Sequence, residues 1–118
     1  MPKVLLAEDD TTMVRLLTTL LRMEGFEVTS LTNFQEPVIQ ALGRERPDAL
    51  ILDVNLPSEN GIDVLRAIRN DKSLKDTYVV MTSGMNLRIE CLDDGANEFL
   101  LKPYMPDDLI SALRRVVT

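Results

Sequence analysis

Five short apolar or alternating runs, with helical patterns between them, constrain the fold of this chain more than any other feature. Three of the runs are continuously apolar, which is typical of strands buried on both faces of a sheet. Residues 27–31 alternate and are more polar, so we expect them to form an edge strand. The runs are Val4–Ala7, residues 27–31, Ala49–Leu52, Tyr78–Thr82 and Phe99–Leu101.

The segments between these runs have apolar residues at helical spacing. Asp10 or Thr11 can cap the first predicted helix, and Gly25 can end it. Asn33 can cap the second helix, with Pro37 in its first turn. The apolar positions of the first, second, third and fifth helices are Met13, Leu16, Leu17, Leu20 and Leu21; Val38, Ile39 and Leu42; Ile62, Leu65 and Ile68; and Leu109, Ile110, Leu113, Val116 and Val117.

The fourth helix is predicted to be short. Few residues between Gly84 and Gly95 are apolar, and Asp93-Asp94 falls near the end of the segment, where acids are unfavourable. Strands alternating with helices imply an α/β, doubly wound (βα)5 domain with one parallel sheet and helices on both faces. In such sheets the functional site lies beyond the carboxyl ends of the strands.

Composition limits the possible functions. The chain has 118 residues, which fits one domain over residues 1–118, with no output domain visible. A single cysteine, no apolar run of membrane-spanning length and no secretion leader favour a cytoplasmic protein without membrane binding. A net charge of −6 disfavours direct binding of nucleic acid. The absence of histidine excludes Ser-His and Cys-His catalysis and His-ligated zinc.

Acidic residues follow two of the predicted strands. Glu8 and Asp9 come after the first strand, and Asp53 comes after the third. If these strands are neighbours, the three carboxylates converge, and two carboxylates about 4 Å apart repel by about 4 kcal/mol at an effective dielectric near 20. Either some of them take up protons, or a hard divalent cation lies among them, for which Mg²⁺, or Mn²⁺ in its place, is the natural choice.

A hydroxyl and a cation should reach the same edge of the sheet. Thr82-Ser83 ends the fourth strand, and Lys102 follows the fifth. A carboxylate, a metal ion, a hydroxyl donor and a lysine together indicate a phosphoryl site with Asp53 as the nucleophile. Each residue alone has an ordinary structural explanation as a turn, cap or loop residue. The ordered set at successive strand ends is what favours the functional interpretation.

This ordered set resembles the response-regulator receiver domains of two-component signalling, of the chemotaxis-regulator type, over essentially the whole chain. The matching residues are Glu8-Asp9, Asp53 with Asn55, Pro57 and Gly61, Ser83-Gly84, Gly95-Ala96, Phe99 and Lys102-Pro103. The resemblance implies a flavodoxin-like sheet in the order 2-1-3-4-5.

The resemblance also implies a chemistry. Asp53 would accept a phosphoryl group from a sensor histidine kinase or a phosphotransfer protein. Mg²⁺ would be held by Asp9, Asp53 and the Asn55 backbone carbonyl, with Glu8 acting through water. Ser83 and Lys102 would contact phosphoryl oxygens, and the bond after Lys102 would be cis. The domain would not be a classical turnover enzyme, although it could remove its own phosphoryl group by self-dephosphorylation.

The expected switch couples Ser83 to the aromatic ring of Phe99, which would rotate inward after phosphorylation. The signal would then appear on the face made by the fourth helix, the fifth strand and the fifth helix, and would change binding of a downstream protein or a homodimer. The stretch from Ser83 to Gly95 is about three residues shorter than is usual for the family, an estimate from motif spacing. This departure leaves Thr82 as a rival for the hydroxyl role.

Three other functions compete with this one. A non-phosphorylated interaction module of the same fold is the main alternative, and the complete set of acids, hydroxyl and lysine argues against it. A haloacid-dehalogenase-type phosphatase needs an acid two residues after the nucleophile, where Asn55 stands. A flavin carrier needs a phosphate loop after the first strand, where the acids would repel the phosphate.

Overall fold

The structure, a computed structural model, describes residues 1–116 and contains one parallel sheet in the order β2-β1-β3-β4-β5. This order confirms the flavodoxin-like topology, and β2 lies at an edge as expected. All five predicted strands are present, each within one residue or so of its expected bounds. The strands are β1 (Lys3–Ala7), β2 (Glu27–Ser30), β3 (Ala49–Asp53), β4 (Tyr78–Ser83) and β5 (Glu98–Leu101).

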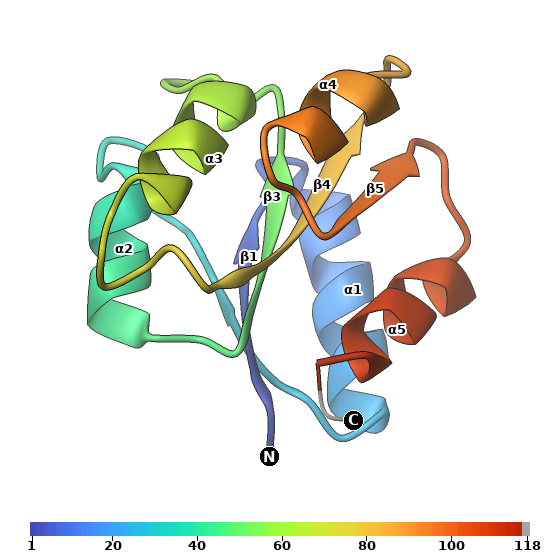
Figure 1. The fold of residues 1–118 in the computed structure, drawn as a ribbon. Coiled ribbons are helices and arrows are strands. Elements are labelled where there is room, and N and C mark those ends of the chain that lie inside the picture. Colours follow the sequence, from blue (N-terminus) through green and yellow to red (C-terminus); the bar gives the residue numbers. More distant parts are fainter. Residues whose placement is uncertain (117–118) are drawn as a thin grey trace.

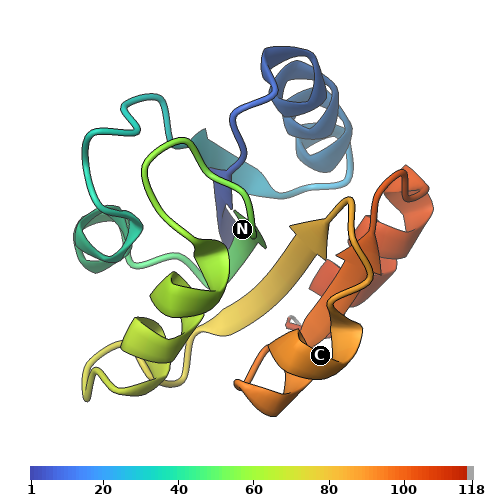
Figure 2. The same ribbon diagram turned by 90° about the horizontal axis from the view of Figure 1, so that it is seen from above.

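Five helices cover the two faces of the sheet (Figure 1). Viewed from above, α1 and α5 lie on one face, whereas α2, α3 and α4 lie on the other (Figure 2). The helices are α1 (Thr11–Met23), α2 (Val38–Glu45), α3 (Gly61–Arg69), α4 (Arg88–Asp93) and α5 (Pro106–Arg114). Val117, which was expected on the last helix, lies outside the described residues.

Alternation along the strands divides the core into two clusters. Leu50 and Leu52 pack under α2 and α3, while Ala49 and Ile51 pack under α1 and α5. All five residues of β3 are buried, as expected for a central parallel strand. By the same alternation, Asp53 and its β4 partner Thr82 continue the α1/α5 face.

The first helix forms as predicted. The Asp10 side chain accepts a hydrogen bond from the Met13 N–H at 3.1 Å, so Asp10 rather than Thr11 is the cap. Gly25 follows the helix with φ of 92°, a left-handed conformation that glycine adopts without steric cost.

The prediction that Asn33 caps the second helix is wrong. Asn33 instead accepts from the Gln35 N–H in a turn, and the helix starts only at Val38, after Pro37. The first N–H of α2 is satisfied from elsewhere, because Glu59 Oε2 in the β3–α3 loop accepts from the Val38 N–H at 2.8 Å. A cap supplied by a distant loop leaves no local sequence signal.

The fourth helix has only six residues, which confirms the prediction that it is short. Two arginines of α3 hold its carboxyl end. Arg66 forms an ion pair with Asp94 at 3.0 Å, and Arg69 Nε donates to the Gly95 carbonyl at 2.9 Å. The α4–β5 turn is therefore fixed to α3 and keeps β5 in register beside β4.

Candidate functional site

The acids predicted to converge do so at the carboxyl edge of the sheet. Oxygen atoms of Glu8, Asp9 and Asp53 all lie within 4.8 Å of one another. Ala7 and Leu52 are register partners, so the next residues, Glu8 and Asp53, leave neighbouring strands at the same level. Glu8 is 4% and Asp53 5% exposed, whereas Asp9 faces solvent.

Lys102 brings a positive charge into this cluster from β5. Its Nζ donates to Glu8 Oε1 at 2.7 Å and to Asp53 Oδ2 at 2.9 Å. Burial alone would lower the pKa of the Lys102 ammonium, but the hydrogen bonds to Glu8 and Asp53 outweigh burial and raise the pKa to about 12. The lysine is therefore charged at any physiological pH. The Lys102–Pro103 bond is cis, as expected.

The charge left in the pocket suits a divalent cation. With the three acids ionised, one ammonium leaves two negative charges uncompensated. Carboxylate oxygens are the ligands that Mg²⁺ prefers, and Asp9 lies open to solvent, where an ion with several waters can enter. A hollow of about 330 Å³ between α1 and the β2–α2 loop borders Glu8 and Asp9. The residues present thus fit the predicted ion.

The loop after β3 fixes the Asp53 backbone and carboxylate. The Asn55 N–H donates to Asp53 Oδ1 at 3.3 Å, which places the Asn55 backbone at the pocket rim. The Val54 N–H donates to the Thr82 carbonyl at 2.9 Å. At Gly61 a Cβ atom would lie only 2.5 Å from the Asp53 carbonyl oxygen, so the close return of the chain requires glycine.

The two candidate hydroxyls lie on β4 and face opposite sides of the sheet. Ser83 is fully buried, and its Oγ accepts from the Met85 N–H at 3.1 Å, which leaves its hydroxyl proton free to donate. Thr82 is the register partner of Asp53 and is 1% exposed. Thr82 therefore shares the face of Asp53, whereas Ser83 shares the face of Phe99.

The ring of Phe99 is in the inward position, 1% exposed. The guanidinium carbon of Arg88, in the first turn of α4, lies 5.5 Å from the ring centroid, within cation–π range. Large apolar side chains are exposed on and around this helix and strand. They are Met85, Ile89, Leu92, Leu101 and Met105.

Sequence reasoning missed Tyr104 and Arg88. The pKa of the Tyr104 phenol is raised to about 12, first by burial and then by the negative charge of Glu8. The phenol therefore lies close enough to the acid cluster to interact with it electrostatically. An aromatic residue two positions after the site lysine was the available signal. No sequence signal pointed to Arg88, because its contact with Phe99 depends on where the shortened helix begins.

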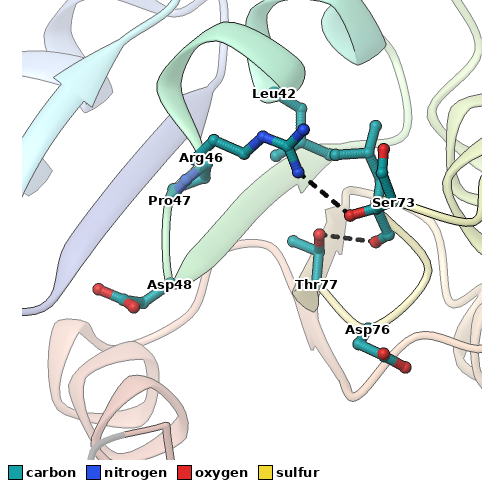
Figure 3. A pocket seen from close by; sticks show the side chains of 8 residues that line it. Leu42, Arg46, Pro47, Asp48, Ser73, Asp76 and Thr77 are labelled. Carbon is teal, nitrogen blue, oxygen red and sulfur yellow. Dashed lines mark hydrogen bonds between the residues drawn. The ribbon is translucent and has the colours of Figure 1, made fainter.

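A second hollow, of about 320 Å³, lies at the opposite end of the sheet and has no comparable chemistry (Figure 3). Arg46, the arginine that lines this hollow, donates a hydrogen bond to the Ser73 carbonyl at 3.2 Å. Asp48 accepts from the Lys3 N–H at 2.7 Å. The polar groups there hold loops together at the amino ends of β3 and β4.

Known proteins share both the sequence pattern and the fold. Residues 4–114 match the response regulator receiver domain family. The DNA-binding response regulator MtrA of Mycobacterium tuberculosis is 32% identical over 115 residues, which are 95% of this chain and 49% of that protein. The transcriptional regulatory protein PrrA of the same species is 30% identical over 117 residues, 98% of this chain and 50% of that protein. The chain spans about half the length of these curated relatives.

Solved structures agree. The chemotaxis response regulator CheY4 of Vibrio cholerae superposes with a TM-score of 0.85 at 29% identity, over 98% of both chains. The receiver domain of sensor histidine kinase PA1611 from Pseudomonas aeruginosa, described with a magnesium ion coordinated in its active-site cleft, superposes at 0.84 with 26% identity, over 99% of this chain and 98% of that chain. Across residues 1–116, no helix is both long and apolar enough to cross a bilayer. The chain belongs to the response regulator receiver domains of two-component signal transduction.

Proposed function

We propose that this domain is a magnesium-dependent phosphoacceptor switch in which Asp53 receives a phosphoryl group from the phosphohistidine of a partner histidine kinase or phosphotransfer protein. The observation that carries this proposal is the contact of Lys102 Nζ with both Asp53 and Glu8 inside a cluster of three carboxylates. The donor histidine lies outside this domain, because residues 1–118 contain none.

In the transfer, an Asp53 carboxylate oxygen forms a bond to phosphorus, and the bond from phosphorus to the donor imidazole nitrogen breaks. Lys102 turns from the Asp53 oxygen to an oxygen of the arriving group and balances its charge. The hydroxyl of Thr82, the alternative to Ser83, shares the face of Asp53 and donates a hydrogen bond to another phosphoryl oxygen. Asp9, Asp53 and the Asn55 carbonyl would hold a Mg²⁺ ion, with Glu8 nearby, and the ion would supply further charge neutralisation. The domain carries the group as a signal and is not a turnover enzyme.

The output depends on Ser83 and Phe99. When the phosphoryl group draws Thr82 toward Asp53, the adjacent Ser83 moves with the end of β4. This shift strengthens the inward position that the Phe99 ring already occupies, and the contact with Arg88 adds to that preference. The exposed apolar side chains on the α4–β5–α5 face, among them Ile89 and Leu101, support this face as the surface that changes its binding of a downstream protein or of a second copy.

Beryllofluoride with Mg²⁺, a stable mimic of an aspartyl phosphate, tests the proposal. The pair should raise the melting temperature of the wild-type domain, because a ligand that binds only the folded state stabilises it. Asp53→Asn should abolish the response. Asp63→Asn, the same chemical change on the exposed surface of α3, should leave it intact.

If beryllofluoride with Mg²⁺ leaves the melting temperature of the wild-type domain unchanged, the result would contradict phosphoacceptor function and favour the interaction-module alternative. Phosphotransfer from candidate histidine kinases, read as a mass increase at Asp53, then identifies the donor.

A further inference from the structure

The loop between β3 and α3 is attached at its tip to the segment that leads into α2. This loop carries Asn55, whose carbonyl is a proposed ligand of Mg²⁺, and it lies beside the β2–α2 loop (Figure 2). Glu59 Oε2 accepts a hydrogen bond from the Val38 N–H at 2.8 Å, and the Ser58 hydroxyl donates to the Phe34 carbonyl. Neither side chain has a task in the proposed chemistry, so contacts outside the pocket hold the outer end of a loop that enters it.

The amino end of α2 depends on Glu59 for a cap. Pro37, at the cap position, makes no side-chain hydrogen bond, and the first turn of the helix contains no acidic residue. A carboxylate at the amino end of a helix satisfies an unpaired N–H and interacts favourably with the helix dipole. Glu59 is partly buried, which strengthens this contact. The bond to Val38 therefore favours one position of the loop tip relative to α2.

A short path of backbone contacts leads from Glu59 toward the pocket. The next residue, Asn60, forms an antiparallel bridge with Asn55, so the two arms of the loop are paired. Where the loop returns to α3, the Gly61 N–H donates to the Val54 carbonyl at 2.7 Å. A displacement of Glu59 is therefore passed through paired backbone to Asn55 and is not absorbed by a free loop.

We propose that Glu59 is a positioning residue for the metal site, which holds the Asn55 carbonyl toward the pocket through its bond to the amino end of α2. The inference rests on the proposed function and deepens it. Glu59 acts by reducing the conformational freedom that the loop must lose when its carbonyl binds Mg²⁺. Because coupling between two sites is reciprocal, binding of Mg²⁺ must strengthen the bond between Glu59 and Val38 by the same factor.

The Mg²⁺ affinity of the whole domain, measured by NMR titration with magnesium chloride, tests this role. Glu59→Ala should weaken Mg²⁺ binding about fivefold, the low end of the usual range for coupling between sites. Glu59→Gln should restore most of the affinity, because the amide oxygen of glutamine still accepts the Val38 N–H. Rescue by glutamine separates the hydrogen bond from the general attraction between a carboxylate and a cation.

Hydrogen exchange supplies a readout that a merely structural role would not change. In the wild type, saturating Mg²⁺ should slow the exchange of the Val38 amide about fivefold. The Gln35 amide, which donates to Asn33 Oδ1 at 3.0 Å in the same segment, should show no comparable change. In Glu59→Ala the exchange of the Val38 amide should no longer respond to Mg²⁺.

Asp71→Ala is the matched control variant. Asp71 Oδ1 also accepts a backbone N–H at 2.8 Å, that of Ser73, but in the turn before β4, at the opposite end of the sheet. The substitution removes the same charge as Glu59→Ala and one hydrogen bond of the same kind. It should lower stability and leave the Mg²⁺ affinity at the wild-type value.

Three results would overturn the assignment. Wild-type Mg²⁺ affinity in Glu59→Ala would remove the role of Glu59 and leave the proposed function standing. An equal loss of affinity in Glu59→Gln or Asp71→Ala would show that lost charge, and not the hydrogen bond, causes the effect. Equal slowing of exchange at Val38 and Gln35 would indicate general stabilisation of the segment. A wild-type domain that responds to neither Mg²⁺ nor beryllofluoride would instead overturn the proposed function, and this role with it.

Discussion

Asp9 is the member of the acid cluster that contributes repulsion without a compensating contact. Its carboxylate lies within 4.8 Å of those of Glu8 and Asp53, yet among residues 1–116 it takes part in no hydrogen bond or ion pair. Asp9→Asn should therefore raise the free energy of unfolding of the metal-free domain, by up to about 1 kcal/mol because solvent screens the exposed group. Urea unfolding in EDTA measures this change.

The same substitution should remove the stabilisation that Mg²⁺ gives to the wild-type domain, because Asp9 is a proposed ligand. Asp63→Asn on the surface of α3 provides the control, because it should leave the response to Mg²⁺ intact. Asp63 pairs with Arg66 at 3.7 Å, so its loss should not raise the free energy of unfolding. A metal-free Asp9→Asn domain less stable than the wild type would mean that repulsion among the acids is not the main effect of Asp9.

At the residue scale, the sequence predicted which side chains meet but not how they bond. The positions of Glu8 and Asp53 at strand ends followed from the periodicity of the strands. The pairing of Lys102 with Glu8, 94 residues away, and with Asp53, 49 residues away, depends on side-chain reach across β4, which no local pattern encodes. The partly buried Tyr104 beside the cluster was missed for the same reason.

At the element scale, the approach of α3 to β3 depends on Gly61. A Cβ at this position would lie 2.5 Å from the Asp53 carbonyl oxygen and 2.7 Å from Val54 Cα, both backbone atoms that cannot move aside cheaply. Gly61→Ala should lower the free energy of unfolding by at least about 2 kcal/mol and weaken beryllofluoride binding, because it displaces Asp53.

Gly43 in α2 offers a matched control for this prediction. Apart from the neighbouring backbone of its own helix, no atom lies within 4 Å of a Cβ built at Gly43, so Gly43→Ala should raise the free energy of unfolding by about 0.5–1 kcal/mol through helix propensity. Urea unfolding of both variants gives the comparison. Equal effects of the two substitutions would contradict the steric role of Gly61.

The elements themselves were largely predictable because each strand and most helices carry their signal locally. Residues 49–52 are uniformly apolar, and the α1 pattern has a cap at Asp10 and a terminator at Gly25. The error at α2 shows the limit. Its first N–H is satisfied by Glu59, which lies 21 residues further along the chain, so the start of the helix is set by tertiary structure.

At the scale of the whole molecule, Lys102 ties together the carboxyl ends of three strands. It follows β5 and reaches Asp53 at the end of β3 and Glu8 at the end of β1, so one side chain spans most of the sheet. A phosphoryl group that draws Lys102 away from Asp53 thereby acts on contacts among β1, β3 and β5 at once. The position of β5, which carries Phe99, is thus coupled to the charge state of the pocket.

The pH dependence of stability tests whether the Lys102 ammonium holds these strand ends together. The pKa of Lys102 is raised from its ordinary value of 10.5 to about 12 in the folded domain. Because the folded state binds this proton more tightly, the stabilisation is fully present below pH 10.5 and is lost as the pH rises toward 12. The difference in unfolding free energy between the wild type and Lys102→Met in EDTA should therefore shrink over this interval, by about 2 kcal/mol in total.

Lys72→Met, at an exposed lysine, controls for general alkaline destabilisation, and its difference from the wild type should stay constant. A wild-type advantage over Lys102→Met that persists unchanged at pH 12 would mean that the ammonium does not hold the strand ends together.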